Sequence, residues 1–332
     1  MSFYSPLPEP IPLKEQSWPE GTRPLLCTST FCFQHETYVR QCIESILMQR
    51  TTFPVRVCIH DDASTDQTSE IIREYQSEYP GIIWAYFQEK NTYWLPNRLE
   101  VQAEYRSWME AGTYIALCEG DDYWTDPLKL QKQVDVLEQN PDVYLCAHDV
   151  DIAYEGVSTP NRERFYDVPY EGNFIFNYSD YLTNHFFHTA SKVYRVPADL
   201  TQYHKLLGSV QAASDILVNQ WFLSMGKGYY MAEKMACKRR NPGGFTSSAS
   251  YRDKEFRLFN RYNLVKEAAK VAPKMMKRRS LQIVADVERQ LTKMMFQKRR
   301  FGIALKYGLL AVAHYPSWFI RKITALTGSN KL

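Results

Sequence analysis

Short apolar runs alternate with amphipathic segments along the first half of the chain. The runs are rich in β-branched and other apolar side chains, as buried strands are, and apolar residues between them recur at helical spacing. Strands that alternate with helices in this way predict an α/β fold with a mostly parallel, doubly wound sheet flanked by helices. The predicted strands are residues 24–31, 55–60, 82–87, 114–118 and 143–148, and a helix is predicted over residues 99–111.

The pattern changes in the second half. Residues 149–197 are irregular and rich in Tyr, Phe, Asn and His. A helix is predicted from Ser214 to about Met225, followed by short strands around GYYMAEKMACKRR. Beyond Tyr251 the sequence is helical in pattern, without the roughly 18 uninterrupted apolar residues of a membrane span. We therefore divide the chain into a Pro-rich N-terminal arm (1–23), an α/β half (24–150), a second half (151–250) and a basic helical C-terminal region (251–332).

The composition excludes several classes of protein. Neither G-x-G-x-x-G nor G-x-x-x-x-G-K-[ST] occurs, which removes the usual support for a dinucleotide-binding or P-loop enzyme. Seven cysteines lie without metal-type pair spacing, several of them in apolar runs, so we expect buried free thiols and a reducing cytoplasm. The first 21 residues lack a basic region followed by an apolar stretch, so no secretory signal is expected there.

Charge is unevenly distributed along the chain. From Lys254 to Leu332 there are 18 Lys and Arg against 4 Asp and Glu, so residues 1–253 carry a net charge of −11 although the whole chain carries +3. The clusters Lys277–Arg279 and Lys298–Arg300, with apolar helical faces between them, suit an anionic membrane surface. A solvated helical appendage is a second interpretation, and nucleic-acid binding is a third that we do not expect.

Carboxylates gather where two of the predicted strands end. Asp61 and Asp62 follow one strand, and Glu119, Asp121 and Asp122 follow another. Because ligands of such sheets bind beyond the carboxyl ends of the strands, these acids lie where a site is expected. Carboxylates are the hard ligands of Mg²⁺ or Mn²⁺, although a solvated acidic turn before a helix is the alternative.

The stretch HDDASTD (His60–Asp66) has two interpretations. An acid at the strand end could accept hydrogen bonds from a base or ribose, whereas Ser64 to Asp66 could simply cap the next helix. Asp126 followed by Pro127 is a further predicted helix start.

Three segments together resemble family 2 glycosyltransferases, in particular bacterial enzymes of cell-surface polysaccharide synthesis. They are LLCTSTFCFQHETYVRQCIESILMQ, VRVCIHDDASTDQTSEIIREY and YIALCEGDDYWTDPLKLQKQVDVLEQNPD. The resemblance implies a GT-A fold that binds a nucleotide-sugar in residues 24–150 and the acceptor in residues 151–250. It further implies transfer from a UDP- or dTDP-sugar to a saccharide or lipid-linked saccharide, with inversion at the anomeric carbon.

The resemblance also implies roles for single residues. Phe33 would lie against the base, Asp62 would bond it, and Asp121 would face the ribose and the metal. Asp122 would bind Mn²⁺ or Mg²⁺ directly. Glu119, which stands where the family has the first Asp of its acidic motif, is the second candidate metal ligand.

An inverting transfer needs a general base for the acceptor hydroxyl. The family places an acid at the head of a helix in the second half, which here corresponds to Asp215, although a plain N-cap is the alternative for that residue. Many relatives have a metal-binding His before a Gly pair, where this chain has Asn241, and Arg239 or Arg240 could pair with phosphate there instead.

The sequence therefore predicts an inverting, metal-dependent glycosyltransferase of the cytoplasm, with a peripheral membrane location as an option. An inactive nucleotide-sugar-binding or membrane-adaptor protein is the first alternative. A nucleotidyltransferase is the second, but CTSTFCFQHETYV lacks the Gly-rich, basic loop that cradles a triphosphate.

Overall fold

The computed structural model describes most of the chain, and the chain divides into two compact units. The first unit comprises Met1–Asp215 and Met225–Asn241, and the second comprises Ile216–Ser224 and Pro242–Leu332. Within them the structure describes residues 4–93, 95, 97–154, 168, 171–183, 186–208, 215–240, 253–271 and 274–316.

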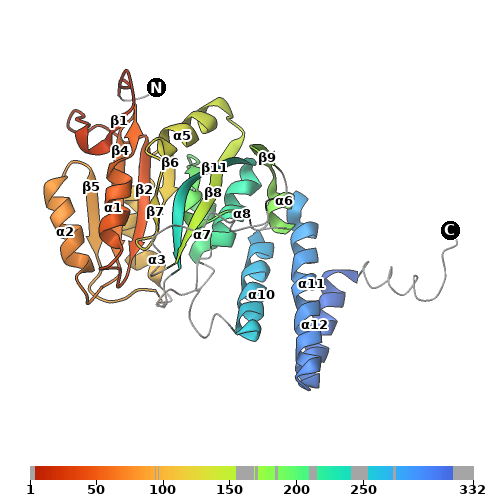
Figure 1. Ribbon diagram of the computed structural model, residues 1–332. Helices are drawn as coiled ribbons and strands as arrows, with labels where there is room; N and C mark the ends of the chain where they lie inside the picture. Colours follow the sequence, from red (N-terminus) through yellow and green to blue (C-terminus); the bar gives the residue numbers. More distant parts are fainter. Residues whose placement is uncertain are drawn as a thin grey trace. The chain divides into compact units, whose positions relative to one another are not determined.

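Four parallel strands form one half of the main sheet in the first unit (Figure 1). They lie in the order β5 (Ile83–Phe87), β4 (Val55–Asp61), β2 (Leu26–Cys32) and β6 (Tyr114–Leu117). All four coincide with predicted strands, and the prediction of an α/β sheet with parallel strands is confirmed here. Because the strands are parallel, the loops that follow β2, β4 and β6 emerge at one edge of the sheet.

Helices connect these strands, as the sequence predicts. They are α1 (Val39–Leu47), α2 (Thr68–Glu78), α3 (Arg98–Val101), α4 (Ala103–Met109) and α5 (Lys129–Gln139). The single helix predicted for residues 99–111 is divided at Gln102, whose buried side chain donates a hydrogen bond to Thr92 Oγ1 at 2.8 Å. Asp126 accepts from the backbone N–H of Leu128 at 2.7 Å, so it acts just before α5.

The other half of the sheet is mixed rather than parallel. A short strand, β10 (Val193–Arg195), runs antiparallel between β6 and β8 (Val143–Tyr154), so β8 does not pair with β6. The long β11 (Lys227–Arg240) runs parallel to β8 through several register shifts and antiparallel to β7 (Tyr123–Trp124) and β9 (Phe174–Phe176). The smaller elements are β1 (Ile11–Pro12), η1 (Leu13–Glu15), β3 (Arg50–Thr51), α6 (Tyr178–Thr183), η2 (Thr189–Ser191) and α7 (Thr201–Gly208).

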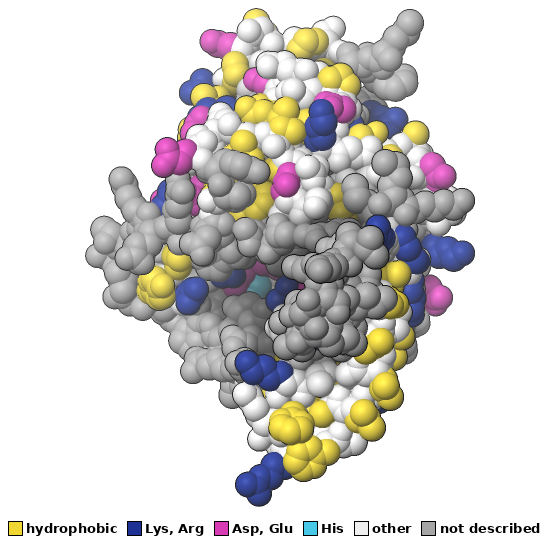
Figure 2. All heavy atoms as spheres, turned by 90° about the vertical axis from the view of Figure 1, so that its right-hand side faces the viewer, with side chains coloured by type: hydrophobic (Ala, Val, Ile, Leu, Met, Phe, Trp, Pro, Cys, Tyr) yellow, Lys and Arg dark blue, Asp and Glu magenta, His cyan; other side chains and the backbone are white. Residues whose placement is uncertain are grey.

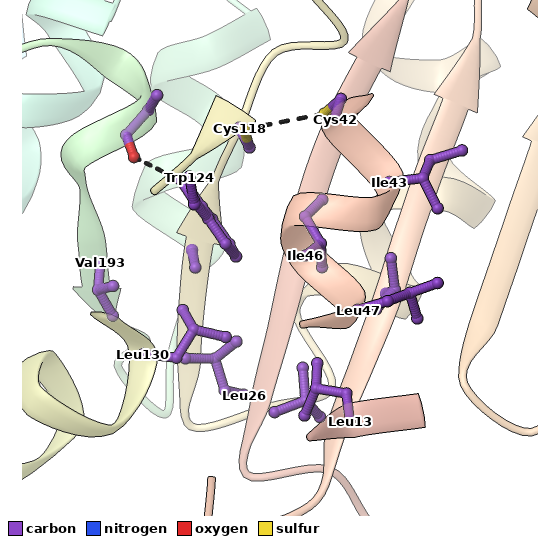
Figure 3. Packing of buried hydrophobic residues seen from close by; sticks show 14 of the residues in the cluster. Leu13, Leu26, Cys42, Ile43, Ile46, Leu47, Cys118, Trp124, Leu130 and Val193 are labelled. Carbon is purple, nitrogen blue, oxygen red and sulfur yellow. Dashed lines mark hydrogen bonds between the residues drawn. The ribbon is translucent and has the colours of Figure 1, made fainter. Parts of the chain in front are cut away.

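A continuous apolar core lies between α1, α5 and the sheet (Figure 3). Trp124 is buried there, and its indole N–H donates to the carbonyl of Ala190 at 2.9 Å. All seven cysteines are free and buried, as predicted, and the sulfur atoms of Cys42 and Cys118 lie 3.8 Å apart. The core thus fixes β7 and η2, which flank the strand-end acids.

The second unit is built from long helices: α10 (Lys254–Val271), α11 (Lys274–Gln297) and α12 (Phe301–His314), together with most of α8 (Asp215–Met225). The helical pattern predicted beyond Tyr251 is confirmed in the described part of that region. Among the helices described, none combines the length and the apolar character that crossing a bilayer requires.

Candidate active site

Two tight loops stand side by side where β2 and β4 end. Gln34 and Ala63, one in each loop, have positive φ angles of 57° and 62°, a conformation that is strained for residues other than glycine. Gln34 holds the loops together, because its N–H donates to Ser64 Oγ at 3.0 Å and its side-chain amide donates to Thr65 Oγ1 at 2.7 Å. The strain therefore falls beside Phe33 and Asp62, the two residues that the sequence assigns to the base.

Phe33 and Asp62 differ in how open they are. The Phe33 side chain is 45% exposed, so the ring is accessible to a ligand. Asp62 is buried, and its Oδ1 accepts hydrogen bonds from the backbone N–H of Thr92 at 2.8 Å and from Thr92 Oγ1 at 2.6 Å. The orientation of the Asp62 carboxylate is thus fixed by the segment that follows β5.

The acidic turn after β6 is pressed against β2. A side chain at Gly120 would place its Cβ 2.6 Å from both Cys32 Sγ and His35 Nδ1, so only glycine fits. The turn is closed by the N–H of Asp122, which donates to the carbonyl of Glu119 at 2.9 Å. Glu119 and Asp122 are thereby held within a single tight turn.

Asp122 is buried with one oxygen satisfied and one not. Its Oδ1 accepts from the backbone N–H of Arg239, on β11, at 2.9 Å. No hydrogen bond from the described residues reaches Oδ2, although His188 Nδ1 lies 3.5 Å away. Candidate ligand atoms of Glu119, Asp122 and His188 all lie within 4.8 Å of one another.

The electrostatics of this cluster favour a bound cation. Glu119 is exposed at its surface, but loss of solvation within the cluster, together with the charges of Asp215 and Asp121, raises its pKa to about 7. Burial and the charges of Asp121 and Glu119 raise the pKa of Asp122 well above its usual value. Because the carboxylates repel one another, a divalent cation would stabilise their ionised forms.

His188 is held neutral. Burial and the ammonium groups of Lys238 and Lys192 keep the pKa of His188 well below its usual value. The backbone N–H of Ala190 donates to Nδ1 at 3.3 Å, and Lys238 Nζ lies 2.9 Å from Nε2, so each ring nitrogen has a neighbouring nitrogen donor. For Nδ1 to bind a metal, the N–H of Ala190 has to release it, the ring proton has to lie on Nε2, and Lys238 has to turn away.

Asp215 is held through one of its two carboxylate oxygens. Thr189 Oγ1 donates a hydrogen bond to Oδ2, and Lys192 Nζ lies 3.0 Å from the same atom. Lys192 is almost fully buried, whereas the Asp215 side chain is 51% exposed. Desolvation raises the pKa of Asp215. The charge of Lys192 and the hydrogen bond from Thr189 lower it by more, so the pKa lies below its usual value.

The structure thus brings Glu119 and Asp122 together. Asp215 is close enough for its charge to raise the pKa of Glu119. Phe33 and Asp62 stand on the neighbouring loops of the same sheet edge. The segment His188–Lys192 connects the acidic cluster to Asp215 and was not identified from the sequence as a unit. The sequence did offer one signal for this segment: Lys192 directly precedes the strand-like residues VYR, and a lysine that is buried beside a strand needs an acidic partner.

Arg239 is committed to structure rather than open to a phosphate. Its guanidinium donates to the carbonyl of Asp121 at 2.8 Å and to the side chain of Gln41, and it lies 4.5 Å from the ring centroid of Tyr123. Asn241, which the sequence places at the family's histidine position, lies outside the described residues.

A divalent metal fits this donor set. The cluster offers two carboxylates and an imidazole, of which one carboxylate oxygen is buried without a hydrogen-bond donor among the described residues. Carboxylates suit Mg²⁺ and Mn²⁺, and imidazole suits transition metals.

The sequence pattern of the family described as glycosyl transferase family 2 matches residues 30–200, just over half of the chain. The chain belongs to this family. The matched residues include Phe33, Asp62, the acidic turn from Glu119 to Asp122 and the segment from His188 to Lys192.

Curated relatives match a shorter part of this family 2 chain. An uncharacterized protein of Mycobacterium tuberculosis is 44% identical over 125 residues, 37% of this chain and 34% of the relative. An uncharacterized glycosyltransferase of Nostoc is 31% identical over 121 residues, 36% of this chain and 34% of the relative. The matched part thus spans about a third of the length of these relatives.

Solved structures share the fold. TarS of S. aureus, in a crystal structure with UDP-GlcNAc, superposes with a TM-score of 0.54 at 16% identity, covering 81% of this chain and 72% of that one. The complex of the same protein with UDP gives a TM-score of 0.53 at 15% identity, with the same coverage. The GT-A-like fold expected from the sequence is therefore confirmed.

Proposed function

We propose that this family 2 protein transfers a sugar from a UDP- or dTDP-sugar to a saccharide or lipid-linked saccharide, with inversion at the anomeric carbon and with a divalent metal. One observation carries the proposal. The segment His188–Lys192 contacts the buried acid Asp122 at one end and holds Asp215 at the other. A cation-binding cluster and a candidate base are thus joined by five residues.

The donor site in this proposal lies on the loops after β2 and β4. The exposed ring of Phe33 would stack on the base, and Asp62, fixed by Thr92, would accept its hydrogen bonds. Asp121 would face the ribose. The crystal structures of TarS with UDP and with UDP-GlcNAc, on a similar fold, support a UDP-sugar donor.

Glu119 and Asp122 would hold the metal, with His188 as a third ligand. When bound, the metal would neutralise charge on the diphosphate leaving group. An imidazole among carboxylates favours Mn²⁺ over Mg²⁺. In this state the Lys238 ammonium, turned away from the imidazole, would be available to phosphate oxygens.

Asp215 would act as the general base. As the acceptor oxygen bonds to the anomeric carbon, the bond from that carbon to the diphosphate oxygen breaks, and the acceptor proton passes to Asp215. Because Thr189 and Lys192 both bind Oδ2, Oδ1 of this half-exposed carboxylate would face the acceptor. General base catalysis of this kind contributes about 10²–10⁴ to the rate.

The test measures sugar transfer and donor hydrolysis for a panel of UDP- and dTDP-sugars, with Mn²⁺ and with a chelator. We expect Asp215→Asn to lower kcat by about 10²–10⁴ while donor affinity stays close to that of the native protein. Asp122→Asn should weaken Mn²⁺ binding, measured by paramagnetic resonance, and abolish turnover.

Asp135→Asn on α5 is the matched control, because this exposed carboxylate bonds only the neighbouring Gln131 among the described residues. Native activity in Asp122→Asn and Asp215→Asn would contradict the assigned roles. Donor binding without turnover in the native protein would support the inactive-binder alternative instead.

A further inference from the structure

Helix α12 presents two different apolar faces. One face packs into the core of the second unit, where Ala304, Tyr307 and Ala311 are buried against α10 and α11. The opposite face carries large apolar side chains that remain in solvent. They are Phe301, Leu305, Leu309 and Val312, which are 56%, 66%, 63% and 36% exposed.

These four residues form one continuous stripe, because their spacing of four, four and three residues places them on the same side of a helix. Phe296, at the end of α11, extends the stripe: its ring is 64% exposed and its centroid lies 5.3 Å from that of Phe301. Figure 2 shows hydrophobic side chains gathered over the lower part of the second unit, with Lys and Arg at the margins. Contiguous apolar exposure of this kind marks an interaction surface.

The charge around the stripe is mostly positive. From Arg289 to Leu332 the sequence contains nine Lys and Arg and no Asp or Glu. Lys293, Arg299 and Lys306 are exposed on or beside α11 and α12. Lys298 and Arg300 share the carboxylate of Glu255, so this pair keeps a net positive charge. A partner of the stripe therefore has to be anionic as well as apolar.

This combination selects among the candidate partners. A symmetric contact between two copies would bring the same basic surface against itself, and like charges would oppose that association. A nucleic acid would meet the charge but offer no apolar phase to the stripe. A bilayer with anionic headgroups offers both, since an amphipathic helix can bury its apolar face at the boundary between headgroups and acyl chains.

We propose that α12, with the end of α11, docks on an anionic lipid surface and inserts the stripe Phe296, Phe301, Leu305, Leu309 and Val312 into the headgroup boundary. The basic residues at the turn and on the flank of α12 would pair with lipid phosphates. The surface is independent of the sugar-transfer site, so its test needs no transfer activity.

The experiment measures binding of the full chain to vesicles of phosphatidylcholine alone and of phosphatidylcholine mixed with phosphatidylglycerol. The native protein should bind the anionic vesicles and bind the neutral ones far more weakly. Leu305→Gln with Leu309→Gln should weaken that binding about tenfold or more, because two inserted apolar side chains are lost. Arg299→Gln with Lys306→Gln should weaken it about fivefold per charge, and only on anionic vesicles.

Ile303→Gln is the matched control. Ile303 is an exposed apolar residue of the same helix, 42% exposed, but it lies off the stripe, so its replacement should leave binding unchanged. Circular dichroism and thermal unfolding would verify that each variant folds. Equal vesicle binding by the native protein and the double leucine variant would overturn the proposal. So would a native protein that ignores anionic vesicles but forms a dimer that the double variant loses.

Discussion

The two units of this protein depart from the usual separation of polar and apolar residues in opposite ways. The first unit buries ionisable side chains, among them Asp122, His188 and Lys192. The second unit leaves a stripe of large apolar side chains in solvent on α12. Burying charge and exposing apolar surface both cost free energy, so each departure indicates a function that the fold alone does not require. In one unit this is a candidate catalytic site, and in the other it is a candidate docking surface.

The largest effect should come from a pair of identical substitutions, one in each unit. Leu130→Ala removes a fully buried side chain from the core of the first unit, which should lower the free energy of unfolding by about 2–5 kcal/mol. Leu305→Ala removes an exposed side chain of the stripe and should change it by no more than about 0.5 kcal/mol. Calorimetric unfolding of the native protein and both variants measures these changes in the free energy of unfolding. A large loss of stability in Leu305→Ala would mean that the stripe packs within the protein.

A second prediction concerns the residues that hold Asp215. Thr189→Val keeps the shape of the side chain but removes the hydrogen bond to the carboxylate, so kcat should fall by about 10- to 100-fold with little change in the KM for the donor. Thr189→Ser, which retains the hydroxyl, should recover most of the loss. Steady-state kinetics with both variants separate a positioning role from donor binding. A raised donor KM at native kcat would contradict the role proposed for Thr189.

The third and smallest effect concerns Lys129, a buried lysine outside the candidate site. Its ammonium lies 4.2 Å from the Trp124 ring centroid and donates to Gln133 Oε1 at 2.7 Å, yet burial lowers the pKa of Lys129 to about 7. The folded protein then binds fewer protons than the unfolded chain between pH 7 and the ordinary pKa of 10.5. Stability should therefore rise with pH across that window, and the cost of the buried charge should be fully present below pH 7.

Lys129→Met should remove this rise, which we expect to amount to about 1–3 kcal/mol because the ring and the amide offset part of the cost. Thermal unfolding of the native protein and the variant from pH 6 to pH 10 gives the difference curve. Lys90→Met, at an exposed lysine, is the control. Parallel curves for the native protein and Lys129→Met would show that Lys129 stays charged throughout.

The sequence predicted the parallel half of the sheet well, because each strand there is a short apolar run between turn residues. It did not predict the antiparallel insertion of β10 between β6 and β8, since strand order depends on contacts between residues far apart in the chain. For the same reason the long β11, broken by register shifts, was predicted as several short strands.

The candidate site divides in the same way. The sequence by itself determined the chemical groups at the strand ends, Asp62 and Glu119 to Asp122, because strand period and acid content are local properties. Only the tertiary structure placed His188 within reach of Asp122, with Thr189 and Lys192 on Asp215, because β10 and the core contact of Trp124 carry that segment to the acidic turn.

The exposed stripe of α12 is a second feature that the sequence alone did not predict. The sequence predicted helices beyond Tyr251, with apolar faces between the basic clusters. Which of its apolar faces is buried depends on how α10 and α11 pack, and only that packing left Leu305 and Leu309 in solvent while it buried Tyr307. The local sequence pattern determines where apolar and acidic side chains cluster. Packing between segments that are far apart in the chain determines which of these clusters remain accessible to a ligand or a surface.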